Sequence, residues 1–376
     1  MHYCNTQGGS SGSPIISLKN NKVIGIHLGD YKHCQCNIGT FIKEVLQKLK
    51  NNGKNKEYEI EIKYENNNES KKRIFGKEFV KNNKENIKII NDKKEEIELD
   101  EKYQFNKNEI NEKNEAILTI RIINDLTNLR HMFFGCKSLK DIKELDKGLN
   151  KLDVSKVKNF EGMFSECTKL SDISGLKSWN VANGKNFNNM FFLCESLSSL
   201  DGLQKWNVSN GTNFESMFAQ CSSLSNIEAL VNWEAPNGKN FSSMFGKCEK
   251  LSNLNGLEHF KPSNGKDFSY MFYECLSLED IEALKDWEAP NGENFSKMFY
   301  YCKQLKDIKD GLKNFDVSKG NNFSQMFDAC WSLENIEGLK EWNVSNGQDF
   351  FDCFYYFDSR EDIKGVKELL NKWKKT

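Results

Sequence analysis

The residues best suited to chemistry lie near the start of the chain. Ser11 stands in the stretch Gly8-Gly9-Ser10-Ser11-Gly12-Ser13-Pro14, and His27 and His33 follow it. A serine hydroxyl attacks a carbonyl efficiently only when a general base takes its proton, because the neutral hydroxyl is a poor nucleophile. Serine chemistry here therefore depends on elements that hold a base against Ser11.

The elements expected around Ser11 are two strands and a helix. Apolar runs at 15–18 and 23–27 follow the glycines, and a helical pattern covers 43–50. This order resembles the C-terminal end of a chymotrypsin-like serine peptidase, especially the trypsin-like and glutamyl-endopeptidase group, in which G-x-S-G-[GS]-P surrounds the nucleophile. The resemblance implies that Ser11 is the nucleophile and that the N–H groups of Gly9 and Ser11 form the oxyanion hole.

The partners that this chemistry needs are not at the places the resemblance requires. In that family His comes first, then Asp, then Ser, whereas only ten residues precede Ser11 here. His2 is too close in sequence to be the base, and His27 and His33 come after the serine. We therefore interpret residues 1–50 as a truncated trypsin-like segment that is inactive in this chain. A peptidase half encoded upstream is the alternative.

A second pattern, a recurring Met-Phe pair, organises most of the chain. After a first step of 31 residues the spacing is 27 residues, with one step of 28. A fixed period of this size predicts stacked repeats, since one such unit cannot bury its own apolar face. We call each position that recurs from repeat to repeat a column. The Met column comprises Met132, Met163, Met190, Met217, Met244, Met271, Met298 and Met326.

Each repeat is predicted to contain an α-helix followed by a brief strand and turn. Phe187, Met190, Phe191, Cys194 and Leu197 have the spacing of one helix face. An Asn or Asp before each such stretch is interpreted as the N-cap, with an exposed amide ladder that binds a ligand as the alternative. This column comprises Asn128, Asn159, Asn186, Asn213, Asn240, Asp267, Asn294, Asn322 and Asp349.

Three further columns have packing interpretations. Large aromatic residues at one position are predicted to stack between repeats, with an exposed aromatic binding strip as the alternative. Asn-Gly pairs such as Asn210-Gly211 are predicted to take positive φ and to reverse the chain. Eight of the twelve cysteines share one column and are interpreted as reduced, packed side chains; a disulfide scaffold is the alternative. The aromatic column comprises Trp179, Trp206, Trp233, Phe260, Trp287, Phe315 and Trp342.

The pattern Met-Phe-x-x-Cys-x-x-Leu-x-x-[Leu/Ile] resembles the BspA-like leucine-rich repeats, including the mycoplasma-type surface-protein repeat, over about 129–358. The resemblance implies an α/β repeat protein, a leucine-rich-repeat-like right-handed solenoid, that binds proteins or surfaces. It does not imply catalysis. The unit of 27 residues is longer than the usual repeat of that family, and Cys353 replaces Met in the last copy.

The remaining segments complete the domain organisation. Alternation at 58–64, a hairpin signal at 87–99 and an apolar run at 116–123 predict a β-rich module. The predicted parts are a truncated peptidase segment at 1–50, a linker at 51–56, the β-rich module capping the solenoid at 57–127, the solenoid at 128–358 and a C-terminal capping helix at 359–376.

Partner binding is predicted on exposed residues that flank the short strands. Two columns qualify, five and seven residues after the cysteine, and together they make a mainly acidic and amide strip; a solvated face is the alternative. Cation binding is not expected there, because no compact carboxylate loop is present. Nor does His33-Cys34-Gln35-Cys36, without a second pair, predict a metal or cofactor. The acidic strip comprises Asp141, Asp172, Asp201, Glu228, Asp280, Glu282, Asp307 and Glu337.

Composition narrows the class of partner and the location. With 53 basic and 54 acidic residues the net charge is -1, which predicts no nucleic-acid partner. No apolar run approaches the roughly 18–20 residues of a membrane span, and the N-terminus lacks the features of a signal peptide. We therefore predict an intracellular protein with reduced cysteines, or a surface protein if the N-terminus is incomplete.

Three functions follow from these patterns. The first is a non-catalytic scaffold that binds a protein partner through the solenoid surface. The second is a trypsin-like serine endopeptidase with C-terminal recruitment repeats, incomplete in this chain. The third is a surface or adhesion protein. The sequence predicts neither the partner's identity nor the oligomeric state.

Overall fold

The computed structural model describes residues 14–17, 22–26, 57–67, 69–143, 145–355 and 366–373. The chain divides into two compact units, Met1–Asn55 and Lys56–Thr376. In the first unit, β1 (Pro14–Ser17) and β2 (Lys22–Ile26) pair as an antiparallel hairpin. The two strands predicted there are confirmed.

The second unit begins with an antiparallel sheet in the order β3-β8-β5-β6. Its inner face is buried and carries Ile60 and Ile62 from β3 and Leu118 and Ile120 from β8. The hairpin predicted at 87–99 is confirmed as β5 with β6. The strands and helix of this region are β3 (Tyr58–Glu65), β4 (Lys72–Arg73), α2 (Lys77–Asn83), β5 (Ile87–Ile90), β6 (Glu96–Glu98), β7 (Lys102–Tyr103) and β8 (Glu115–Ile122).

This sheet and the segment just before α2 cover the open edge of the first repeat. The N–H of Glu61 in β3 donates to the carbonyl of Lys147 at 2.6 Å, and the N–H of Gly76 donates to Met132 at 3.0 Å. The rings of Phe75 and Phe133 lie 5.8 Å apart. Both the backbone and the apolar side chains of the first repeat are therefore shielded from water.

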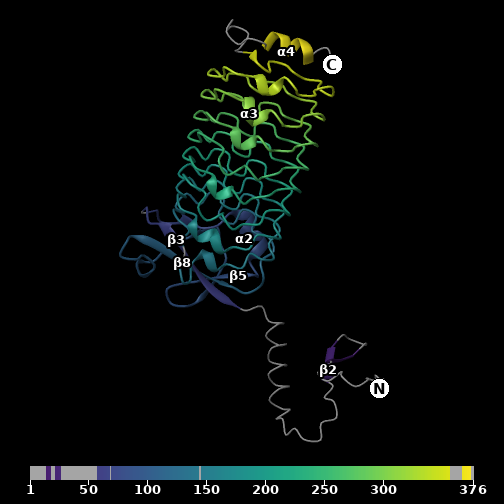
Figure 1. Ribbon diagram of the computed structural model, residues 1–376. Coiled ribbons are helices and arrows are strands. Elements are labelled where there is room, and N and C mark those ends of the chain that lie inside the picture. The colour runs from purple at the N-terminus through teal and green to yellow at the C-terminus, as the bar shows by residue number, and fades with distance from the viewer. Residues whose placement is uncertain are drawn as a thin grey trace. The chain divides into compact units, whose positions relative to one another are not determined.

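Residues 128–355 wind through successive coils, one for each repeat, and Figure 1 shows the coils stacked between the sheet and α4. We call this segment the coil stack. Parallel bridges join its Asn column from coil to coil, as in Asn159 with Asn186 and Asn186 with Asn213. Its right hand and its leucine-rich-repeat class stay predictions.

The helix predicted over the Met-Phe stretch is wrong. The stretch forms two successive β-turns, in which the N–H of Met190 donates to Phe187 and that of Cys194 donates to Phe191, at 3.2 and 3.1 Å. Asn189 and Leu193, the third residue of each turn, have φ of 54° and 58°. In these turns every second main-chain N–H points out of the coil and donates to a carbonyl of the next repeat. An α-helix would instead use its N–H groups for hydrogen bonds within itself.

The Asn column caps these turns and no helix. Asn186 Oδ1 accepts the N–H of Asn188 at 3.1 Å, and Asn213 Oδ1 accepts that of Glu215 at 3.1 Å. The predicted type of hydrogen bond is therefore present, as an Asx turn. The alternative interpretation, a ladder of amides fully exposed to a ligand, does not fit the structure, because both Asn side chains accept a hydrogen bond in this turn.

Aromatic rings stack along the axis of the coil stack, as predicted. The rings of Phe160 and Phe187 are 5.3 Å apart and nearly parallel, and those of Trp179 and Trp206 are 6.3 Å apart. The indole N–H of Trp206 donates to a carbonyl of the preceding coil, that of Leu176, at 2.9 Å. All seven members of the aromatic column are buried, so the exposed aromatic strip is wrong.

The Asn-Gly pairs reverse the chain without positive φ, which corrects the prediction. Gly211 closes a turn by donating its N–H to Val208 at 2.8 Å, and Asn210 Nδ2 donates to Ala182 of the preceding coil at 2.9 Å. Gly211 is required for a steric reason: a Cβ there would lie 2.3 Å from Cζ of Phe214.

The cysteine column is packed and free of disulfides. Nine cysteines from Cys136 to Cys353 are free and buried. Cys194 Sγ donates to the carbonyl of Phe164 in the preceding coil at 3.2 Å, and the same bond recurs in other coils. Burial raises the pKa of Cys221 to about 12, so this thiol stays neutral near pH 8.

The far end of the coil stack is covered by α4 (Val366–Trp373). The ring of Trp373 stacks on Trp342 at 6.1 Å and lies 5.6 Å from Phe350. Short helical turns follow the brief strands; they are the 3-10 turns Leu149–Lys151, Ser174–Ser178, Glu228–Leu230, Glu282–Leu284 and Glu337–Leu339 and the α-turn α3 (Lys309–Leu312).

Replacing Gly211 with alanine is expected to destabilise the coil stack by about 1–3 kcal/mol, because the new Cβ overpacks Phe214. Gly246→Ala is the matched control, since a Cβ there meets its nearest atom at 3.3 Å and Ala219 occupies the same column. Urea midpoints measured under identical conditions test the difference. Equal midpoints for the two variants would contradict this role of Gly211.

The nine buried thiols are expected to react with iodoacetamide at pH 8 about 100-fold more slowly in the native protein than in urea, because burial suppresses the thiolate. Since folding raises their pKa, their contribution to stability is complete below about pH 8.5 and is lost as the pH rises. Mass spectrometry of the alkylated peptides locates each thiol. Fast native labelling of Cys221 would disprove its burial.

Candidate functional site

The first column of the acidic strip, five residues after the cysteine, builds the coil. Isolated parallel bridges join Asp141 to Asp172 and Asp307 to Asn335. Their side chains accept main-chain bonds two residues on: Asp280 Oδ1 takes the N–H of Glu282 at 2.7 Å, and Asp307 Oδ1 takes that of Lys309 at 2.7 Å. These residues are therefore a second Asx-turn column.

The second column, seven residues after the cysteine, points its side chains into solvent. Asp201, Glu228, Glu282 and Glu337 are all exposed. Two of them pair with lysines of their own short helical turns: Glu282 with Lys285 at 3.3 Å and Glu337 with Lys340 at 3.1 Å. The hydrogen bond from Lys340 lowers the pKa of Glu337, which keeps that carboxylate ionised.

The acidic strip thus forms one edge of the coil stack. Its first column supports the main chain, and its second column faces solvent. The structure brings its members together coil by coil, and it also places basic residues among them. Asp141 forms an ion pair with Lys143 at 3.2 Å, which raises the pKa of that lysine. Lys309 interrupts the exposed column. Chemically, the edge can accept charge-assisted hydrogen bonds but holds no group that is poised for proton transfer.

Ser11 and Gly9 lie outside the described residues, so their roles as nucleophile and oxyanion hole stay predictions. The β1–β2 hairpin follows them in the chain. Within the described ranges, no group of three or more His, Cys, Asp or Glu could hold a metal ion. No helix in those ranges is long and apolar enough to span a membrane.

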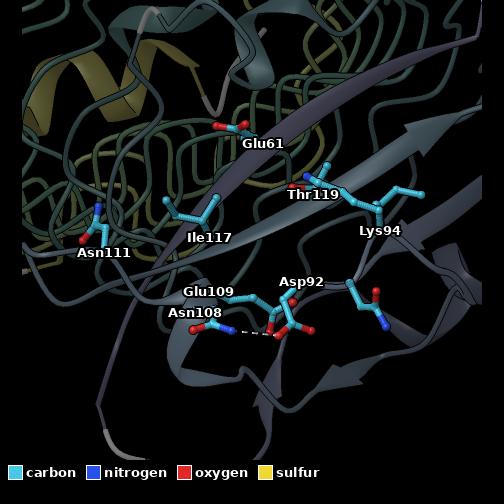
Figure 2. A pocket seen from close by; sticks show the side chains of 10 residues that line it. Glu61, Asp92, Lys94, Asn108, Glu109, Asn111, Ile117 and Thr119 are labelled. Atoms are coloured by element: carbon cyan, nitrogen blue, oxygen red, sulfur yellow. Dashed lines mark hydrogen bonds between the residues drawn. The ribbon is translucent and has the colours of Figure 1, made fainter.

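A polar hollow that the sequence did not reveal lies on the outer face of the sheet (Figure 2), with a volume of about 260 Å³. Glu61 of β3 and Thr119 of β8 form part of its lining. Two of its carboxylates are already engaged: Asp92 accepts bonds from Asn106 and Asn108 at 3.2 and 3.3 Å, and Glu109 accepts one from Tyr103 at 2.7 Å. These bonds fasten a loop to the β5–β6 hairpin, so we assign the hollow a structural role.

The two columns of the strip are expected to respond differently to mutation. Asp280→Ala removes the acceptor for the N–H of Glu282 and should cost about 0.5–2 kcal/mol, the range for a lost cap. Glu282→Ala is the matched control, because its exposed side chain supports no main-chain group, and it should change stability by less than about 0.5 kcal/mol. Urea midpoints measure both. A larger loss for Glu282→Ala would refute the division of roles.

Comparison with known proteins bears on the repeat and not on the peptidase-like segment. A family model described as "Mycoplasma protein of unknown function, DUF285" matches residues 127–255, 195–308 and 280–369, which together run over more than half of the chain. No curated protein and no solved structure matched the chain. The mycoplasma-type part of the resemblance is therefore confirmed, and the chain belongs to the family described as "Mycoplasma protein of unknown function, DUF285".

Proposed function

We propose that this chain is a non-catalytic scaffold that binds a protein partner through exposed side chains of the coil stack. The proposal rests on one observation: each repeat has one set of residues that packs in the core and another set that is exposed. The Met, Phe, Cys and aromatic columns are buried and stack on their own copies. What is left for a partner is the set of exposed positions, which differ from coil to coil.

The exposed column of the acidic strip is the surface we propose for this contact. Asp201, Glu228, Glu282 and Glu337 lie on one edge, and hydrogen-bonded neighbouring coils repeat at about 4.8 Å, the spacing of paired strands. A partner with basic side chains could therefore meet several carboxylates at once. Exposed charge pairs act mainly on association rate and specificity, so this binding should weaken with salt.

The two other interpretations of the sequence would use the same coil stack. A serine endopeptidase with recruitment repeats depends in addition on Ser11 and Gly9, and a surface or adhesion protein differs in location. Neither has an observation of its own among the described residues, and the scaffold needs only the surface that is present.

Site-specific photo-crosslinking tests the scaffold. A benzophenone amino acid at Glu228, on the proposed edge, should give a discrete adduct in the native cell, whereas one at the exposed Lys185, in the Asn-Gly part of the coil, should not. Neutralising two other members of the same column with Asp201→Asn and Glu282→Gln should reduce the adduct about fivefold, because each removes a charge contact.

Two results would contradict the scaffold at this edge. One is an equal yield of adducts from positions 228 and 185, which would indicate nonspecific contact. The other is an unchanged adduct in the neutralised background. Urea midpoints of the variants serve as the control for folding.

A further inference from the structure

An aromatic cluster lies on the Met-Phe part of the later coils. Its members are Tyr270, Tyr273, Tyr300, Tyr301 and Trp331, which we call the tyrosine patch. Neighbouring rings are in contact: the centroids of Tyr273 and Tyr300 are 5.7 Å apart, those of Tyr300 and Tyr301 5.9 Å, and those of Tyr301 and Trp331 5.5 Å. Trp331 is 40% exposed, whereas the six other tryptophans are buried.

Lysine ammonium groups lie over these rings. Lys297 Nζ is 5.1 Å from the ring centre of Tyr270 and 5.7 Å from that of Tyr300. Lys303 Nζ is 4.3 Å from Tyr301 and 4.8 Å from Trp331. Among the described residues, neither lysine forms an ion pair with a carboxylate, in contrast to Lys247, which pairs with Glu274 at 3.4 Å. The patch therefore holds two ammonium groups that form no ion pair with a carboxylate of the described residues.

The fold does not require these aromatic residues. The column of Tyr270, one before Met, holds Ser216 and Ser243 in two earlier coils, and the column of Tyr273 and Tyr300 holds Ala219 and Gly246. Those coils make the same main-chain bonds, for example Phe191 to Met217 and Phe245 to Met271. Since small residues close the coil equally well, the main-chain bonds between coils do not depend on these bulky rings.

We propose that the tyrosine patch, with Lys297 and Lys303, is a docking surface for an acidic segment of a partner protein. The inference rests on the proposed scaffold function and adds a second contact surface, of opposite charge to the acidic strip. Lysine ammonium groups donate charge-assisted hydrogen bonds to carboxylates, and Tyr and Trp are among the side chains that contribute most at protein interfaces.

An acidic peptide fits this patch better than a nucleic acid does. Bases bind single-strand proteins by stacking on free ring faces. Here ring faces are taken up by a neighbouring ring, as between Tyr273 and Tyr300, or by the ammonium groups of Lys297 and Lys303. The net charge of -1 also supplies no general attraction for a phosphate backbone.

The test uses the full chain and a fluorescein-labelled peptide of alternating glutamate and glycine, with a glutamine-glycine peptide as control. Fluorescence anisotropy should show binding of the glutamate peptide alone, weakened by salt. Lys297→Ala with Lys303→Ala should raise Kd about tenfold, because both cations facing the carboxylates are lost. The matched control is Lys266→Ala with Lys306→Ala, exposed lysines that pair with Glu293 and Glu279; it should leave Kd within about twofold.

Trp331 supplies a local readout. Bound peptide should protect its fluorescence from acrylamide, and Trp331→Phe should abolish the protected signal while the buried tryptophans stay unquenched. Equal binding by both double variants, equal binding of the glutamine peptide, or tighter binding of an oligothymidylate of the same length would each overturn the proposal. If no peptide binds while position 228 still gives its crosslink, the patch proposal fails and the scaffold function stands.

Discussion

The structure depends on a main-chain bond that leaves each coil for the next. In the Met-Phe stretch, the N–H groups of Phe187, Asn189 and Phe191 donate to Asn213, Glu215 and Met217, while the N–H groups between them close turns within the coil. No coil satisfies its own backbone, so no coil is stable alone. The unsatisfied edges at the two ends explain why β3 lies against the first coil and why Trp373 of α4 covers the last aromatic rings.

That constraint also explains where the sequence was informative and where it misled. The columns that face inward follow from apolar spacing alone, and they were predicted from Phe187, Met190, Phe191, Cys194 and Leu197, all of which are buried. A chain of β-turns and an α-helix place these positions inward equally well, and an Asn acceptor begins both. What separates them is positive φ at residues such as Leu193, which is costly for that side chain and occurs because the bonds to the next coil compensate for it. The sequence of a single repeat cannot reveal a hydrogen bond that joins two repeats.

The site was less predictable than the fold. The acidic strip joined two columns that look alike in composition, yet Asp280 supports the main chain and Glu282 does not. Only the direction of each side chain distinguishes a structural carboxylate from an exposed one. The tyrosine patch gave little periodic signal, because only Tyr273 and Tyr300 share a column. Tyr301 and Trp331 belong to two other columns and become neighbours only when coils stack.

A coil stack of this kind separates folding from recognition. Serine, alanine or glycine closes the Met-Phe turns as well as tyrosine does, since the ladder and the buried rings carry the energy. Surface side chains can therefore change in groups without loss of the fold, and different stretches of one coil can carry charges of opposite sign. The carboxylates of Glu282 and Glu337 and the ammonium groups of Lys297 and Lys303 lie on two such stretches. A partner that engaged both would need a basic and an acidic element that contact separate parts of the same few coils, and it would be rejected by a stack in which either group was missing.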